Sequence, residues 1–351
     1  FKDTPAGFSG LREGPLAVSN LTIEMADKYN VGIDMQLFNK LSVTADAFYD
    51  KRKNMLIDGS NLYSSIIGVD IPQQNIGRCN SKGIDMSLRW DDRYKKDFNY
   101  YIGATFSYLR TEIEENGEGY QPYDYLYKKG NRIGQLYGLE AIGYFRDDAD
   151  IASSPKQTFD EVRPGDVKYK DQNGDNKIDQ NDIVPIGHSS TIPAIYYGIS
   201  LGFEYKGFGI DALFQGAGQY SRMLNTRSVY WPLRNNNSNL TKWYIEDNVR
   251  WTEDTKGSAN LPRLTTKSNA NNFRASTQWL ENGAFFKLRN LNIYYNLPQK
   301  WCNSMKMNQF QVYLRGNNIF SLDHIKYLNC EDLTINYPDL MSLFVGVNIN
   351  F

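Results

Sequence analysis

Apolar and polar residues alternate along long stretches of this 351-residue chain. From 98 to 108 every second residue is apolar or aromatic, and most residues between them are small or polar. The pattern returns over 195–205 and, after the turn at Lys206 and Gly207, over 208–215. Because successive side chains of a strand point to opposite faces, each stretch is predicted to be a β-strand with one apolar face.

Further stretches alternate in the same way, which brings the prediction to about ten strands. They are 31–37, 41–49, 84–90, 136–145, 291–297, 310–314 and 343–351. Many of these strands reach the ~9–11 residues that a tilted membrane strand needs, whereas strands of soluble proteins average about 5–6. Soluble β-sandwiches also alternate. Strand length, polar inward faces and an aromatic last residue, Phe351, favour an antiparallel transmembrane β-barrel.

The connections between the predicted strands are unequal. Short links at 39–40 and 206–207 contrast with long polar links at 112–132, 146–193 and 216–284. Membrane barrels have short periplasmic turns and long extracellular loops, so the asymmetry also assigns the two sides. The last long link carries tryptophans that either stack on sugar rings, pack on a partner or form the loop's own core. They are Trp231, Trp243, Trp251 and Trp279.

Composition narrows the class of protein. The mean hydropathy is −0.56, and no run approaches the ~18–20 apolar residues of a membrane-spanning helix, which excludes a helical membrane protein but not a barrel. The net charge of −1 gives no sign of a nucleic-acid partner. Three cysteines without close spacing form neither a disulfide framework nor a zinc motif. With only two histidines and no nucleophile motif, the chain is not expected to be an enzyme.

The segment 171–182 has the spacing of a calcium loop. Positions 1, 3, 5, 7, 9 and 12 are Asp171, Asn173, Asp175, Lys177 (through its carbonyl), Asp179 and Asp182. Asn176 replaces the usual Gly at position 6, where Asn tolerates a left-handed conformation, and Asp replaces the bidentate Glu at position 12. Ile178 is expected to anchor the loop on its apolar side. The loop resembles those of dockerins, and we expect structural Ca²⁺; a solvated Asx-turn loop without metal is the alternative.

Motifs in order along the chain resemble the SusC/RagA family of TonB-dependent transporters. The signature segment is 164–179, PGDVKYKDQNGDNKID. The others are NVGID at 30–34, KGID at 82–85, YKGF at 205–208, RWT at 250–252, LPRL at 261–264, STQWL at 276–280, FKLRNL at 286–291, LP at 297–298 and GNNIF at 316–320. An ordered series is far more specific than any one motif.

The resemblance implies a 22-stranded barrel with an N-terminal plug in the outer membrane of a Gram-negative, Bacteroidetes-like bacterium. It further implies import of oligosaccharides or peptides, energised by TonB, under a SusD-like lipoprotein lid. Residues 1–351 are then expected to be the C-terminal portion of the barrel, bordered by outer-membrane lipid, without the plug or the TonB-contacting region. Since Phe1 follows no signal-like stretch, any export signal is expected to be removed or upstream. A soluble calcium-binding adhesin or carbohydrate-binding β-domain is the alternative.

Inward polar residues are expected to line the lumen. Candidates are Asp85, Arg89, Asp211 and Arg315, although a register shift of one residue would reverse this assignment. The resemblance supplies no substrate-contacting residue, because the family varies its loops.

Overall fold

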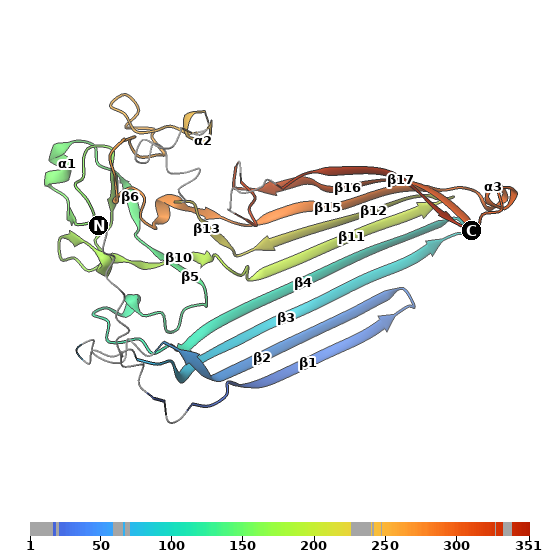
Figure 1. Cartoon of the computed structure of the whole chain (residues 1–351), viewed down its shortest axis with the longest axis horizontal. Coiled ribbons are helices and arrows are strands. Elements are labelled where there is room, and N and C mark those ends of the chain that lie inside the picture. The colour runs from blue at the N-terminus through green and yellow to red at the C-terminus, as the bar shows by residue number, and fades with distance from the viewer. Residues whose placement is uncertain are drawn as a thin grey trace, which may run out of the picture.

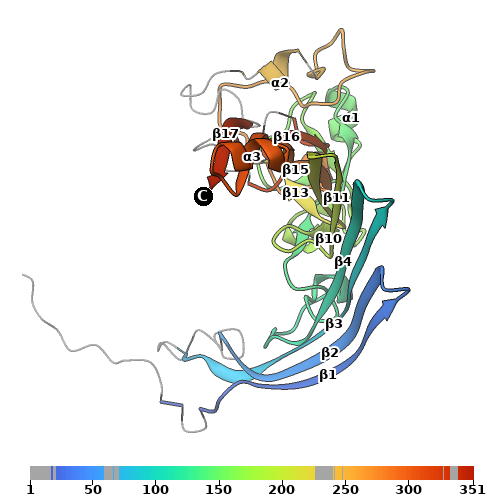
Figure 2. The ribbon, with the colours of Figure 1, turned by 90° about the vertical axis from the view of Figure 1, so that its right-hand side faces the viewer.

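A nine-stranded antiparallel sheet dominates the computed structural model, in the order β1-β2-β3-β4-β11-β12-β15-β16-β17 (Figure 1). Described are residues 17–18, 21–58, 66, 71–225, 240, 242–246, 248–326, 328–332 and 339–351. The nine strands are β1 (Met25–Leu37), β2 (Leu41–Ile57), β3 (Gln74–Tyr94), β4 (Phe98–Glu115), β11 (Ile195–Tyr205), β12 (Phe208–Gly218), β15 (Phe285–Asn296), β16 (Gln309–Asp323) and β17 (Ser342–Asn350). The sheet curves into an arc that does not close (Figure 2), as a part of a barrel would.

Alternation located the strands better than it located their ends. The strand predicted at 195–205 is β11 itself, whereas β3 extends ten residues beyond the predicted start at 84, to Gln74. The prediction at 136–145 is wrong. That stretch forms two short strands outside the sheet, because the Leu139 N–H donates to the Ala275 carbonyl and the Leu139 carbonyl accepts from Thr277. The segment from Ala275 to Thr277 thus supplies the backbone hydrogen bonds that a neighbouring barrel strand would otherwise provide.

Cross-strand register divides the sheet into two chemically distinct faces. One continuous rung runs Met35, Val43, Leu88, Ala104, Ile199, Phe214 and Leu288. The adjacent rung runs Asp34, Thr44, Ser87, Thr105, Gly198, Gln215 and Lys287. Apolar side chains of the first face stay open to the surroundings, with Leu88 39% and Ile102 51% exposed. A contiguous apolar face of this extent requires lipid or a partner, so we assign the polar face to the barrel interior.

Aromatic rings gather on the apolar face near both ends of the strands. Near the short turns, Phe98 packs against Tyr100, Phe203 and Tyr205. Near the long loops, Phe286 stacks on both Tyr197 and Phe214. Phe106, the register partner of Tyr197, is eight residues along β4 from Phe98. The two aromatic groups are therefore ~26 Å apart along the strand, which is ~20 Å in height at a strand tilt of about 40°. The apolar band of membrane barrels is about 25 Å tall and lies between such belts.

The two ends of the sheet differ, as the link lengths predicted. Tight turns join β1 to β2, β3 to β4 and β11 to β12 at one end, where the longer link after β15 carries the helix α3 (Gln299–Ser304). Long links occupy the other end (Figure 1). Their elements are η3 (Asp124–Leu126), β5 (Gln135–Gly138), β6 (Ala141–Tyr144), α1 (Asp148–Ala152), β7 (Lys156–Gln157), β8 (Val167–Tyr169), β9 (Lys177–Ile178), η4 (Gln180–Asp182), β10 (Val184–Ser189), β13 (Ser221–Met223), α2 (Lys242–Ile245), η6 (Thr277–Trp279) and β14 (Leu280–Asn282). None of the helices in the described residues is long and apolar enough to cross a membrane.

Candidate functional site

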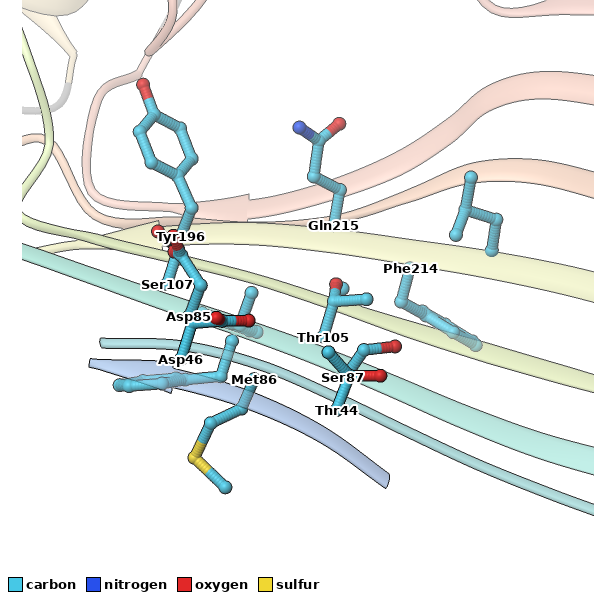
Figure 3. Close-up of a pocket in the computed structure, with 14 residues that line it drawn as sticks. Thr44, Asp46, Asp85, Met86, Ser87, Thr105, Ser107, Tyr196, Phe214 and Gln215 are labelled. Atoms are coloured by element: carbon cyan, nitrogen blue, oxygen red, sulfur yellow. Dashed lines mark hydrogen bonds between the residues drawn. The ribbon is translucent and has the colours of Figure 1, made fainter. Parts of the chain in front are cut away.

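A hollow of about 550 Å³ lies on the polar face, over β2, β3, β4, β11 and β12 (Figure 3). Its polar-face side chains are Thr44, Asp46, Asp85, Ser87, Thr105, Ser107, Tyr196, Leu213 and Gln215. Met86 and Phe214 also border it, but in Figure 3 they point to the other side of the sheet, as the alternation requires. The hollow is therefore an interior feature, and most of its inward side chains carry a hydroxyl, carboxylate or amide group beside apolar lining atoms.

Two carboxylates face each other across neighbouring strands in this hollow. Asp46 on β2 is the direct register partner of Asp85 on β3, and Asp85 is in turn opposite Ser107 on β4. The Ser107 hydroxyl donates to Asp85 Oδ1, and Thr44 Oγ1 donates to Asp34 Oδ1 at 2.8 Å. A carboxylate that accepts one hydrogen bond from a neighbouring hydroxyl keeps further lone pairs, which can face the hollow. Such a wall can accept hydrogen bonds from a polar substrate.

A second polar group lies toward the short-turn end of the same face. The Arg89 guanidinium carbon lies 4.3 Å from the centre of the Tyr101 ring, and the Tyr101 hydroxyl donates to Asp211 Oδ1 at 3.0 Å. Asp211 is opposite Asn292, which is opposite Arg315. All four residues predicted to line the interior, Asp85 included, therefore lie on the polar face.

Above the sheet, the long links are joined by the carboxylate of Asp166. This side chain is fully buried. Arg263 Nε lies 2.7 Å from Asp166 Oδ1, and the Asn269 and Asn272 side chains donate to the same oxygen at 3.0 and 2.8 Å. The Arg163 N–H donates to the other oxygen. A buried charge needs this degree of compensation, so Asp166 holds the link 116–194 against the link 219–284. We call the described residues of these two links the loop module.

The tryptophans of the loop module lie in its core. Trp279 is 2% exposed and donates through Nε1 to the Asn272 carbonyl, and Trp251 is 7% exposed. Trp243 packs against the same apolar cluster, while Trp231 lies outside the described residues. For Trp251 and Trp279 a role in stacking on sugar rings is therefore wrong, and the alternative of a loop core is confirmed. Their rings have no free face to offer a ligand.

Several of the quoted motifs contact one another in the loop module. Gly165 of the signature segment has φ +87°, and a Cβ there would lie 2.4 Å from the Trp251 ring, which belongs to the motif RWT. Asp166 of the same segment pairs with Arg263 of the motif LPRL. The sequence contained both partners. Nothing in their spacing indicated that they meet across 97 positions.

The segment 171–182 forms a tight loop of Asx-type turns. Asp171 accepts from the N–H groups of Gly174 and Asn176, at 2.7 and 2.8 Å, and Asn176 has φ +62°. Ile178 is fully buried against Leu139, Val167 and Tyr169, which confirms its anchoring role.

The remaining predicted ligands of the calcium loop are also engaged with the backbone. Asn173 Oδ1 accepts from Asp175, and Asp175 Oδ1 accepts from Lys177. Asp179 caps η4, and the buried Asp182 accepts from Gln172 and from Asp179 at 2.8 Å each. Within the described residues, no group of three or more His, Cys, Asp or Glu side chains is arranged to hold a metal ion.

Two curated relatives from Formosa agariphila match almost the whole chain. The TonB-dependent receptor P26 is 23% identical over 371 residues, which cover 98% of this chain and 36% of the relative. The TonB-dependent receptor P3 is 22% identical over 95% of this chain and 35% of its own length. This chain thus spans about a third of the length of the receptors that it matches. No family model matches it.

Solved structures of a RagAB importer have the same fold. The RagAB peptide transporter superposes with a TM-score of 0.72 at 25% identity, over 93% of this chain and 35% of the other. The open-open state of the RagAB peptide importer gives a TM-score of 0.74 at 24% identity, over 97% of this chain and 36% of the other. The relatives are receptors and transporters rather than enzymes, and their name implies an outer-membrane β-barrel. The ordered motifs, the two-faced open sheet and these matches identify the chain as part of the barrel of a SusC/RagA-like TonB-dependent transporter.

Proposed function

We propose that the transporter containing this chain imports oligosaccharides or peptides across the outer membrane of a Gram-negative, Bacteroidetes-like bacterium. TonB supplies the energy through a region outside residues 1–351, and a SusD-like surface lipoprotein closes over the loops. The observation that carries the proposal is the polar hollow around Asp46 and Asp85 on the interior face. Its hydroxyl, carboxylate and amide groups suit a substrate rich in hydrogen-bond donors.

Uptake by intact cells tests the proposal. Cells carrying the complete transporter would be given a fluorescently labelled oligosaccharide mixture or a labelled peptide mixture, with and without an active TonB system. We expect TonB-dependent accumulation of one class, and a several-fold reduction when Asp46→Asn and Asp85→Asn are combined. Ser87→Ala is the matched control, since it lines the same hollow without a charge. Uptake of neither class, or uptake that ignores TonB, would contradict the proposal.

Purification tests the partner and excludes the alternative of a soluble adhesin. The tagged complete protein should be extracted from membranes only with detergent and should carry one stoichiometric surface lipoprotein. A protein that stays in solution without detergent as a monomer would favour the adhesin.

We further propose that the loop 171–182 binds Ca²⁺ as a structural ion. The proposal rests on the ligand spacing, on the left-handed Asn176 and on the buried Ile178. The ion would be held by oxygens of Asp171, Asn173, Asp175, the Lys177 carbonyl, Asp179 and Asp182 after the turns rearrange. Adding Ca²⁺ to the chelator-treated complete protein should then slow proteolysis of this loop. Asp171→Ala with Asp175→Ala should abolish the effect, whereas Asp160→Ala, in the same link, should keep it. Equal proteolysis with calcium and with chelator would refute the site.

A further inference from the structure

Residues 328–332, between β16 and β17, fold back onto the polar face. The evidence is Lys287 on β15, which shares a rung with Gln215 and Thr105 of the hollow. Its ammonium lies 2.8 Å from Glu331 Oε2 and 2.9 Å from Asn329 Oδ1, and its side chain is only 6% exposed. Residues 328–332, which we call the strap, therefore cross the interior face at the end of the hollow nearest the loops.

A second cation, Arg289, lies at a β-bulge and contacts the same carboxylate. Register shifts between Leu213 and Phe214 and between Leu288 and Asn290 leave Arg289 without a rung partner. Its guanidinium then contacts Glu331 Oε1 and donates to Gln215 Oε1 at 2.7 Å. Bulges are a common device for re-aiming a side chain. Regular alternation would also place Lys287 and Arg289 on the polar face. At the bulge, Arg289 hydrogen-bonds with Gln215 on β12 and with Asn318 on β16.

The strap is held to the loop module as well as to strand β15 of the sheet. Arg222 on β13 donates to the Cys330 carbonyl at 2.9 Å and to the Glu331 carbonyl. The Cys330 side chain is fully buried in a cluster with Tyr244, Trp279 and Phe285. The ion pairs that hold the strap to the sheet are those of the Glu331 carboxylate with Lys287 and Arg289, and they involve side chains alone. Their removal would free the strap while leaving the backbone ladder of the sheet intact.

We propose that the strap is a latch on the substrate path, closed by the ion pairs of Glu331 with Lys287 and Arg289. Gln215 connects it to the path, because this residue both lines the hollow and accepts the Arg289 hydrogen bond. Opening of the latch uncovers Cys330 and leaves two cations on the wall beside the hollow. The part of this inference that concerns substrate rests on the proposed import function, whereas the latch itself does not.

Thiol labelling in native membranes tests the latch without any transport measurement. The complete transporter would be treated with a maleimide, and modification of each cysteine followed by peptide mass spectrometry. Cys79, Cys302 and Cys330 are all free and buried, so Cys79 and Cys302 serve as internal references. Glu331→Gln keeps the shape of the side chain and removes its charge. We expect it to raise the labelling rate of Cys330 by about tenfold or more, with the references unchanged.

The controls separate a local latch from general loosening. Glu253→Gln removes one member of an exposed pair with Lys256, and it should leave the labelling rate of Cys330 at its wild-type value. A rise at all three cysteines in Glu331→Gln, or no rise at Cys330, would overturn the latch. If the latch opens and the uptake rate of the imported class changes, the strap lies on the substrate path. If it opens while wild-type uptake is retained, the link to the path is wrong. Absence of uptake in the wild type would count against the import function alone.

Discussion

The sheet and the loop module of this chain are organised on opposite principles. In the sheet, polar residues occupy one open face and apolar residues the other, and few side chains are fully enclosed. In the loop module the enclosed side chains include a carboxylate, Asp166, and three asparagines, Asn269, Asn271 and Asn272. Each face of the sheet is matched in polarity to the surroundings that it contacts. The module has to satisfy these polar groups internally, because they are buried away from solvent.

The two regions should therefore fail in different ways. A sheet residue matters through the face on which it lies, so its neighbour along the strand is its natural control. A module residue matters through its particular partners, so an exposed residue of the same type is the control.

Asp166→Ala should disrupt the loop module more than any other single change. It leaves Arg263 beside a buried site without its counter-charge and removes the acceptor of Asn269 and Asn272. Breaking one side of a buried ion pair typically costs about 3–5 kcal/mol. Hydrogen exchange of the detergent-solubilised transporter should show lost protection over the module, with the sheet retained. Glu161→Ala, which removes an exposed pair with Arg163, should change little. Equal effects of both variants would show that the network does not hold the module.

Sequence patterns predicted the sheet well for a definite physical reason. A period of two depends only on neighbouring residues, so the apolar side of most strands can be assigned from the sequence alone. The loop module follows no period. Asp166 and Arg263 are 97 positions apart, and only folding brings them together. The failed strand prediction at 136–145 has the same origin, since Ala275 and Thr277 supply its partners.

The candidate sites divide along the same line. Asp85, Arg89, Asp211 and Arg315 could be assigned to the interior because alternation fixes their face. The strap could not be foreseen, because Glu331 lies 44 and 42 positions from Lys287 and Arg289, and only folding brings them together. The calcium loop remains a prediction from spacing, with only its anchor Ile178 and its left-handed Asn176 observed.

Leu88→Arg should destabilise the barrel, whereas Ser87→Arg should be tolerated. Leu88 is central on the apolar face, and an arginine at the bilayer midplane of a barrel costs about 2–4 kcal/mol. Ser87 is the adjacent residue and faces the open hollow. The free energy of unfolding of the complete transporter in vesicles, measured by denaturant titration, compares the two. A larger loss for Ser87→Arg would reverse the assignment of the faces.

Gly165→Ala should cost about 1–3 kcal/mol more than Gly130→Ala. Both glycines have positive φ, +87° and +83°, so the backbone strain of alanine is similar at the two positions. A Cβ at Gly165 meets the Trp251 ring at 2.4 Å, but one at Gly130 meets nothing within 4 Å. The difference thus isolates the packing of the two motifs. Local opening free energies from hydrogen exchange provide the measurement, and equal costs would mean that Trp251 gives way without resistance.

The smallest expected effect concerns the acid sensitivity of the strap. Burial alone would raise the pKa of the Glu331 carboxyl, but hydrogen bonds and charges from Lys287 and Arg289 outweigh it and hold the pKa below its ordinary 4.5. Other titratable or charged groups near this carboxyl include Arg222, Asp339, Tyr196, Tyr220 and the neutral Cys330 thiol. Arg222, the tyrosines and the Cys330 thiol do not change charge in acid, and Asp339 shares Lys287 at 3.5 Å. Glu331 is therefore the main group whose protonation weakens the latch.

A lowered pKa in the folded state means that the ion pairs stabilise the strap fully above pH 4.5 and lose that contribution as the pH falls through the folded value. Hydrogen exchange of residues 328–332, corrected for the intrinsic rate at each pH, should be constant from pH 7 to about 5 and faster at lower pH. Glu331→Gln has no carboxyl to protonate, so its corrected rate should be high at every pH, and the wild type should approach it in acid. If the corrected exchange rate rises just as much in acid in Glu331→Gln, another group causes the transition. The charge of Glu331 would then not hold the latch closed.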